Sequence, residues 1–74
     1  MQSDELQKAL LAAHAADDRR ALVALYLEAA DLAEAGQNIE KACFYLTHAW
    51  IFALETDHEM RHALRTRLAG RGRV

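Results

Sequence analysis

Small residues recur at helical spacing in the middle of this chain, and that spacing restricts its fold more than any other feature. Ala42 and Ala49 flank Leu46 on what would be one helix face, because residues three and four positions apart are neighbours on a helix surface. Ala29, Ala30 and Ala33 form a similar group upstream. Between the groups lie Gly36, which favours a helix end, and Asn38, a preferred N-cap. The pattern predicts two antiparallel helices whose backbones approach closely at alanines.

Composition extends this prediction to the whole chain. The 74 residues contain no proline and are 53% hydrophobic, with alanine and leucine, both good helix formers, in abundance. A chain of this length has room for one small domain. We expect an all-α domain spanning residues 1–74, a hairpin array of four antiparallel helices. The helices are expected at about residues 4–16, 18–35, 39–55 and 57–69, followed by a flexible basic tail at residues 70–74.

The helix boundaries rest on local signals. Gly36 is expected to adopt the left-handed conformation that ends the second helix. Thr56 and Glu59 have capping-box spacing, which predicts that Thr56 opens the fourth helix. Asp17 and Asp18 mark the first boundary, but no glycine or proline interrupts the chain there. One long helix through these aspartates therefore stays open as an alternative.

The residues from Tyr26 to Leu54 resemble one tetratricopeptide repeat. Tyr26 stands where that family often has tryptophan, and Ala42, Leu46 and Ala49 match its second helix. The repeat is about 34 residues long, and the flanking helices would be half-repeats. The match departs from the family at Leu54, which takes the place of a proline. A generic four-helix array with small interface residues is the alternative.

The resemblance implies a protein-binding module that grips peptides on the face of its first-type helices. The matching positions are Leu27 and Asp31 on the second helix, and Arg61 and Arg65 on the fourth, one repeat further on. Arg61 and Arg65 resemble the basic pair with which some family members hold a peptide's terminal carboxylate. Asp31 would repel a carboxylate, so a looser site for an acidic peptide or partner fits these residues better.

Charge is distributed unevenly along the chain. All eleven acidic residues, but only four of the nine basic ones, precede Met60. Five arginines and no acid follow it, so this segment is either a solvated basic face or a surface for an acidic partner. A protein using these arginines on nucleic acid is the alternative function. We expect nucleic acid to be an unlikely partner because the domain as a whole is not basic.

His58, Glu59 and His62 match the His-Glu-x-x-His signature of zinc hydrolases. On a helix the two histidines could share a zinc ion. A catalytic zinc also needs a third protein ligand, and the chain after Ala63 offers no His, Asp, Glu or Cys. A zinc-dependent hydrolase is therefore only a remote alternative. We expect no catalytic residue, no metal site and no cofactor.

The third helix is expected to be apolar on more than one face. Phe44, Ile51 and Phe52 fall away from the face formed by the alanines. If they stay exposed, they form a patch of the kind that marks protein interfaces. We expect a homodimer or an obligate partner at this patch. The acidic N-terminus and short apolar runs predict a cytoplasmic protein without a membrane segment.

Overall fold

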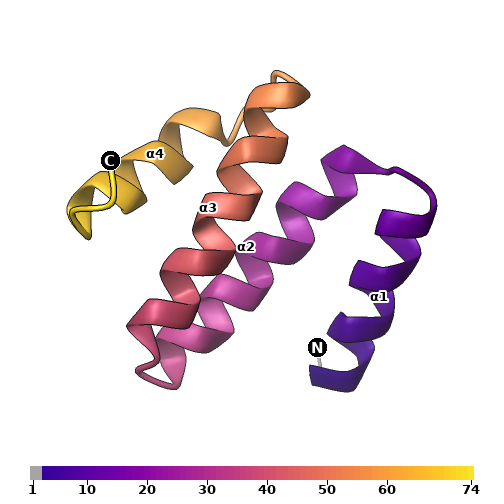
Figure 1. Cartoon of the computed structure of the whole chain (residues 1–74), viewed down its shortest axis with the longest axis horizontal. Helices are drawn as coiled ribbons and strands as arrows, with labels where there is room; N and C mark the ends of the chain where they lie inside the picture. Colours follow the sequence, from indigo (N-terminus) through magenta and orange to yellow (C-terminus); the bar gives the residue numbers. More distant parts are fainter. Residues whose placement is uncertain (1–2) are drawn as a thin grey trace.

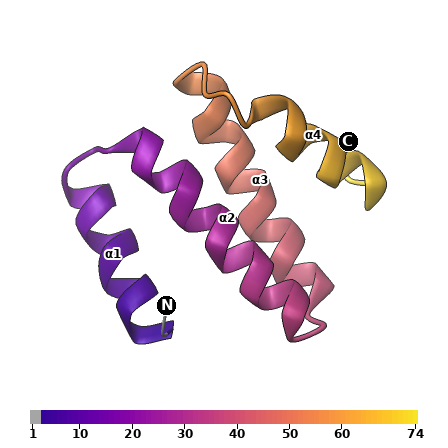
Figure 2. The same cartoon turned by 180° about the vertical axis from the view of Figure 1, so that it is seen from behind.

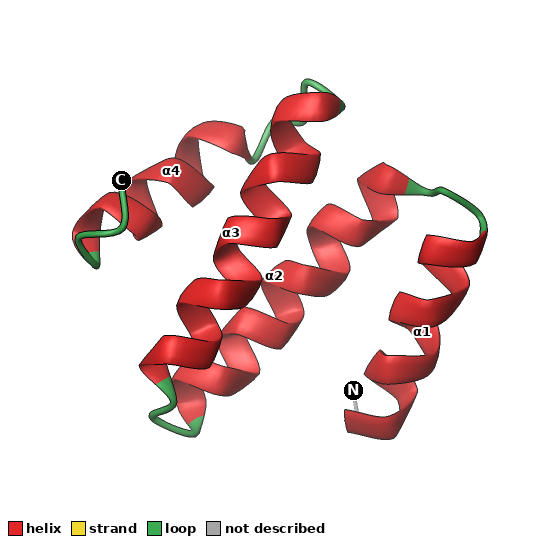
Figure 3. Ribbon diagram, viewed as in Figure 1, coloured by secondary structure: helices red, strands yellow, loops and turns green. Residues whose placement is uncertain are grey.

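The computed structural model describes residues 3–74 and contains four helices and no strand within that range (Figures 1 and 3). The helices are α1 (Ser3–Ala15), α2 (Arg19–Ala35), α3 (Ile39–Glu55) and α4 (Arg61–Gly70). The predicted all-α class is confirmed. The helix ends agree closely with the predicted ranges for α2 and α3, and less well for α4.

The α2–α3 hairpin lies at the centre of the molecule. From the other side, α1 and α4 lie on opposite flanks of this hairpin (Figure 2). Backbone packing joins α1 to α2, α2 to α3 and α3 to α4, and no other pair of helices in residues 3–74 approaches as closely. The result is a flat molecule with extents of 32 × 29 × 14 Å. Helices α1 and α3 therefore both pack on α2, and their own backbones do not approach each other.

The core divides into two clusters on either side of α2. The larger cluster joins α2, α3 and α4, and the smaller joins α1 to α2. Ala30 and Ala49 are both fully buried in the larger cluster, as expected for alanines at a close helix crossing. The clusters consist of Val23, Ala30, Leu46, Ala49, Ala53, Leu64 and Leu68, and of Leu6, Leu10, Ala13, Leu22 and Ala29.

The same backbone turn ends each of the first three helices. The residue two positions beyond the last helical residue has positive φ: 53° at Asp17, 61° at Gln37 and 50° at Asp57. After α2, the amide of Asn38 donates to the carbonyl of Ala33 at 2.9 Å, and that of Gln37 donates to Glu34 at 2.9 Å. This is the Schellman arrangement. The left-handed residue is thus Gln37, and the prediction for Gly36 was wrong, since Gly36 has φ −85°.

The same kind of turn interrupts the helical backbone between α1 and α2. The amide of Asp18 donates to Ala13 at 2.9 Å, and the Asp18 side chain then accepts from the amide of Ala21 at 3.2 Å, as an N-cap. The alternative of one continuous helix through these aspartates is therefore excluded.

The predicted capping box at Thr56 was wrong. Thr56 is the C-cap of α3, and its hydroxyl donates to the carbonyl of Phe52 at 2.8 Å. The Thr56 side chain therefore belongs to the end of α3. Helix α4 starts at Arg61, four residues later than expected, and its N-cap Met60 makes no side-chain capping bond.

Arginines near the C-terminus connect α4 and the tail to the central hairpin. Arg67 pairs with Asp31 at 3.0 Å and also with Glu34. Arg71 pairs with Glu34 at 2.8 Å, and Arg73 pairs with Glu40 at 2.9 Å. The hydrogen bond from Arg71, reinforced by Arg67 against the opposing effect of desolvation, lowers the pKa of Glu34. The pairs of Arg67 link α4 to α2, whose backbones do not pack together, and the pairs of Arg71 and Arg73 link the tail to α2 and α3.

Within residues 3–74, no helix combines the length and apolarity needed to cross a membrane.

Candidate functional site

A groove runs between α1 and α3, with α2 as its floor. Because the backbones of α1 and α3 pack on α2 but not on each other, their facing sides stay open near the start of α3. The hollow measures about 200 Å³. Its lining is mainly apolar or small, with a few polar groups at the rim: Leu6, Gln7, Ala29, Leu32, Ala33, Gly36, Asn38, Lys41 and Tyr45.

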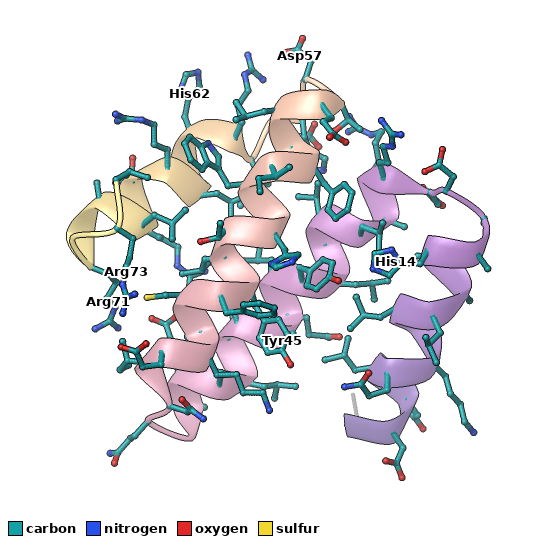
Figure 4. All side chains as sticks on the ribbon, in the orientation of Figure 1. His14, Tyr45, Asp57, His62, Arg71 and Arg73 are labelled. Carbon is teal, nitrogen blue, oxygen red and sulfur yellow. The ribbon has the colours of Figure 1, made fainter. Side chains whose placement is uncertain are left out.

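Aromatic rings and histidines gather around Tyr26, and Tyr45 of this cluster lines the groove. Nε2 of His14 and the Tyr26 hydroxyl share a hydrogen bond of 2.9 Å. The Tyr26 ring stacks on Phe52 with 6.1 Å between centroids, and its centroid lies 5.2 Å from that of His48. Figure 4 shows His14 projecting from α1 toward the middle of the molecule, and Tyr45 on the facing side of α3. Burial, and to a lesser extent Tyr45, raises the pKa of Tyr26, so this hydroxyl stays protonated at neutral pH.

The groove carries a single charge, which is positive. Among its lining residues within the described chain, Lys41 is the one ionised side chain and there is no carboxylate. Lys41 is exposed, and its ammonium lies 5.9 Å from the centroid of the Tyr45 ring, within cation–π range. The rim therefore offers a cation that an acidic group of a ligand can approach.

The four residues expected from the repeat resemblance do not form one prepared site. Leu27 is partly buried against the larger core cluster, and Asp31 is engaged by Arg67 at 3.0 Å. Arg61 lies 3.3 Å from Asp57 and donates to the carbonyl of His58 at 2.8 Å. Arg65 is exposed. Of the four, only Arg65 projects into solvent without an ion pair in residues 3–74.

The spacing of the helices explains why Leu27 and Arg61 do not occupy equivalent positions on α2 and α4. Leu27 is the ninth residue of α2, whereas Arg61, 34 positions later, is the first residue of α4. The first residues of α2 and α4, Arg19 and Arg61, are 42 positions apart. The two helices are thus offset from the register of a 34-residue repeat.

The C-terminal arginines are largely neutralised by the protein itself. Four of the five pair with carboxylates: Arg61 with Asp57, Arg67 with Asp31 and Glu34, Arg71 with Glu34, and Arg73 with Glu40. The basic segment that the sequence indicated is therefore part of the contact between α4, the tail and the hairpin.

The His-Glu-x-x-His residues are not on one helix. His58 lies in the turn before α4, where it is buried and its Nδ1 accepts from the amide of Met60 at 3.0 Å. His62 is exposed on α4. Glu59 instead accepts from Arg20 at 2.8 Å. Within residues 3–74 no three His, Cys, Asp or Glu side chains gather closely enough to hold a metal ion.

The residues proposed for self-association have different environments. Phe44 is 57% exposed and Ile51 46% exposed. Phe52 is half-buried, because it stacks on Tyr26. The exposed apolar face of α3 thus contains Phe44 and Ile51 but not Phe52.

The groove between α1 and α3 was not predicted from the sequence. The excess of apolar residues on the third helix was the one available signal, since Tyr45 and Phe52 lie on the side that faces α1. Nothing local identifies Gln7 or Lys41, because the groove exists only through the way α1 leans on α2.

No family model, no curated protein and no solved structure matches this chain. The groove, its single cation and the exposed face of α3 are the features from which a function can be inferred.

Proposed function

We propose that this chain is a non-enzymatic protein-interaction module that binds a short segment of a partner protein in the groove between α1 and α3. One observation carries this proposal: the backbones of α1 and α3 both pack on α2 but not on each other, and they leave an open hollow of about 200 Å³ with an apolar floor. Grooves of this kind accept the apolar face of a peptide helix.

The chemistry of the lining indicates the ligand. Leu6 and Leu32 offer apolar contacts, and Leu32 is 47% exposed, so burying it would favour binding. Lys41 and the absence of carboxylates in this lining favour an acidic group on the ligand. An amphipathic peptide with an acidic residue beside its apolar face fits both features.

This proposal keeps the functional class that the tetratricopeptide-like pattern implied and changes the surface. The expected residues Leu27, Asp31 and Arg61 are occupied by contacts within the protein. Within the groove lining, Leu32 and Lys41 stay exposed, and Lys41 makes no ion pair in residues 3–74. A cytoplasmic location belongs to the same proposal.

Selection of displayed peptides against the immobilised protein tests the function. A library of amphipathic peptides with varied charge should enrich acidic members that bind the wild-type chain. Leu32→Glu should abolish their binding, because it places a carboxylate in the apolar lining. Lys41→Glu should weaken it by repulsion.

Matched variants outside the groove serve as controls. Leu54→Glu changes another exposed leucine, at 53% exposure, and Lys8→Glu changes another exposed lysine. Both should bind like the wild type. Enrichment of no peptide, or of peptides that bind the Leu32→Glu chain equally well, would refute the proposal.

A further inference from the structure

The outward face of α3 has the spacing of a coiled-coil seam. Counting along the helix, Lys41, Phe44, His48, Ile51 and Glu55 are separated by alternating steps of three and four. This spacing places them on one stripe of the helix. The stripe lies opposite the buried face that includes Ala42, Leu46 and Ala49. Its two apolar members, Phe44 and Ile51, are about half exposed, at 57% and 46%.

A hollow suited to a side chain lies beside this stripe. It measures about 280 Å³ and is lined by Glu40, Cys43, Phe44, Thr47, His48 and Arg73. Glu40, Cys43, Phe44 and Thr47 have the spacing i, i+3, i+4 and i+7 along α3. Four residues so spaced form the hole that receives one side chain of a facing helix in coiled-coil packing. The exposed stripe therefore has both a projecting side chain, Ile51, and a receiving hollow beside Phe44.

Charges at the two ends of the stripe select an orientation. Lys41 and Glu55 are each seven residues from His48. If two copies of α3 cross antiparallel about His48, Lys41 of each copy faces Glu55 of the other. In a parallel pair, like charges would face each other. Glu55 lies 3.3 Å from Arg19 but its side chain stays 43% exposed, so a second cation can reach it.

We propose that a second copy of this chain docks on the outward face of α3, antiparallel, with a two-fold axis beside His48. Ile51 of each copy enters the hollow beside Phe44 of the other. Two Lys41–Glu55 pairs flank the contact. In Figure 1, α3 lies in front of α2. A two-fold pairing uses the same stripe twice and leaves no open end.

The inference does not rest on the peptide-binding function, because α3 pairs through Phe44 and Ile51, which lie outside the groove lining. A peptide would compete for Lys41, so the test uses the chain alone. Sedimentation equilibrium over a range of micromolar concentrations measures the monomer–dimer equilibrium. We expect the wild-type chain to dimerise.

Charge reversal tests the orientation. Lys41→Glu and Glu55→Lys should each raise the dimer dissociation constant about 4- to 30-fold, because each converts two attractive pairs into repulsive ones. The double variant Lys41→Glu/Glu55→Lys should recover wild-type association. An equimolar mixture of the two single variants should form the heterodimer in preference to either homodimer. Lys8→Glu and Glu5→Lys, both exposed on α1, are the matched controls and should dimerise normally.

Apolar variants test the face itself. Phe44→Glu and Ile51→Glu should each give a folded monomer, with circular dichroism reporting the fold. If one of them fails to fold, the other decides. A wild-type chain that stays monomeric throughout overturns the proposal. A dimer that survives both single charge reversals also overturns it, because that dimer pairs in another orientation or through another face.

Discussion

Replacing Ala30 by leucine tests the close approach of α2 and α3. Ala30 and Ala49 are both fully buried, at 0% exposure, in the cluster that joins these helices. A leucine adds three carbon atoms where no space is open to solvent. The helices must then move apart or the new side chain must adopt a strained rotamer. Overpacking of this kind costs about 1–3 kcal/mol.

This cost is large for so small a protein. A chain of 74 residues has a free energy of unfolding of roughly 4–11 kcal/mol at 0.05–0.15 kcal/mol per residue. In a domain of this size, each 1 kcal/mol shifts the melting temperature by about 4–8 °C. Ala30→Leu and Ala49→Leu should therefore each lower it by about 4–24 °C.

Thermal unfolding provides the assay, followed both by circular dichroism and by the fluorescence of Trp50, which packs against the same cluster. Coincident transitions would establish two-state unfolding. Ala24→Leu is the matched control: it makes the same substitution on α2 at an exposed position and should change stability by no more than about 0.5 kcal/mol. Unchanged midpoints in both buried variants would refute the close packing of these alanines.

Three further substitutions test the ion pairs of Glu34 and the α2–α3 turn. The ion pairs with Arg71 and Arg67 lower the pKa of the Glu34 carboxyl below its ordinary 4.5. The stability that ionised Glu34 contributes is therefore fully present above that pH, and it is lost as the pH falls through the lower pKa of the folded state. Glu34→Gln should therefore destabilise the protein at neutral pH, with a difference from wild type that disappears in acid; a difference independent of pH in urea titrations would contradict this. At the α2–α3 turn, Gln37→Gly should stabilise by about 0.5–1 kcal/mol, because glycine removes the strain of a left-handed residue at some entropic cost. Gly36→Ala should be tolerated, since an added Cβ meets only ordinary contacts at 3.6 Å; the reverse ranking in thermal melts would show that Gly36 is the special position.

The sequence by itself determined the four helices and the buried alanines. Helix formation follows from local periodicity, so the ranges of α2 and α3 and the burial of Ala30 and Ala49 could be predicted from spacing alone. Gly36 and Asn38 also indicated where the chain reverses, and Asn38 does cap α3 by accepting from the amide of Lys41 at 3.2 Å.

The details of the turns depended on how each helix ends. The Schellman hydrogen bonds fix the left-handed residue two positions after the helix, which places it at Gln37 rather than at the nearby glycine. From local sequence alone, Thr56 could be either the N-cap of α4 or the C-cap of α3. Its position at the end of α3 decided between them, because its hydroxyl reaches the carbonyl of Phe52.

Only the tertiary structure decided the candidate sites. The groove needs α1 and α3 to pack on α2 with their own backbones apart, and Leu6, Leu32 and Lys41 reach it from three different helices. In the same way, Asp31 and Arg67 are far apart in the sequence and meet at 3.0 Å only because α4 folds back over the hairpin. Local periodicity specifies which face of a helix is buried. Which faces stay open, and which charges are neutralised, depends on the positions of the neighbouring helices, and these are set by packing between distant residues.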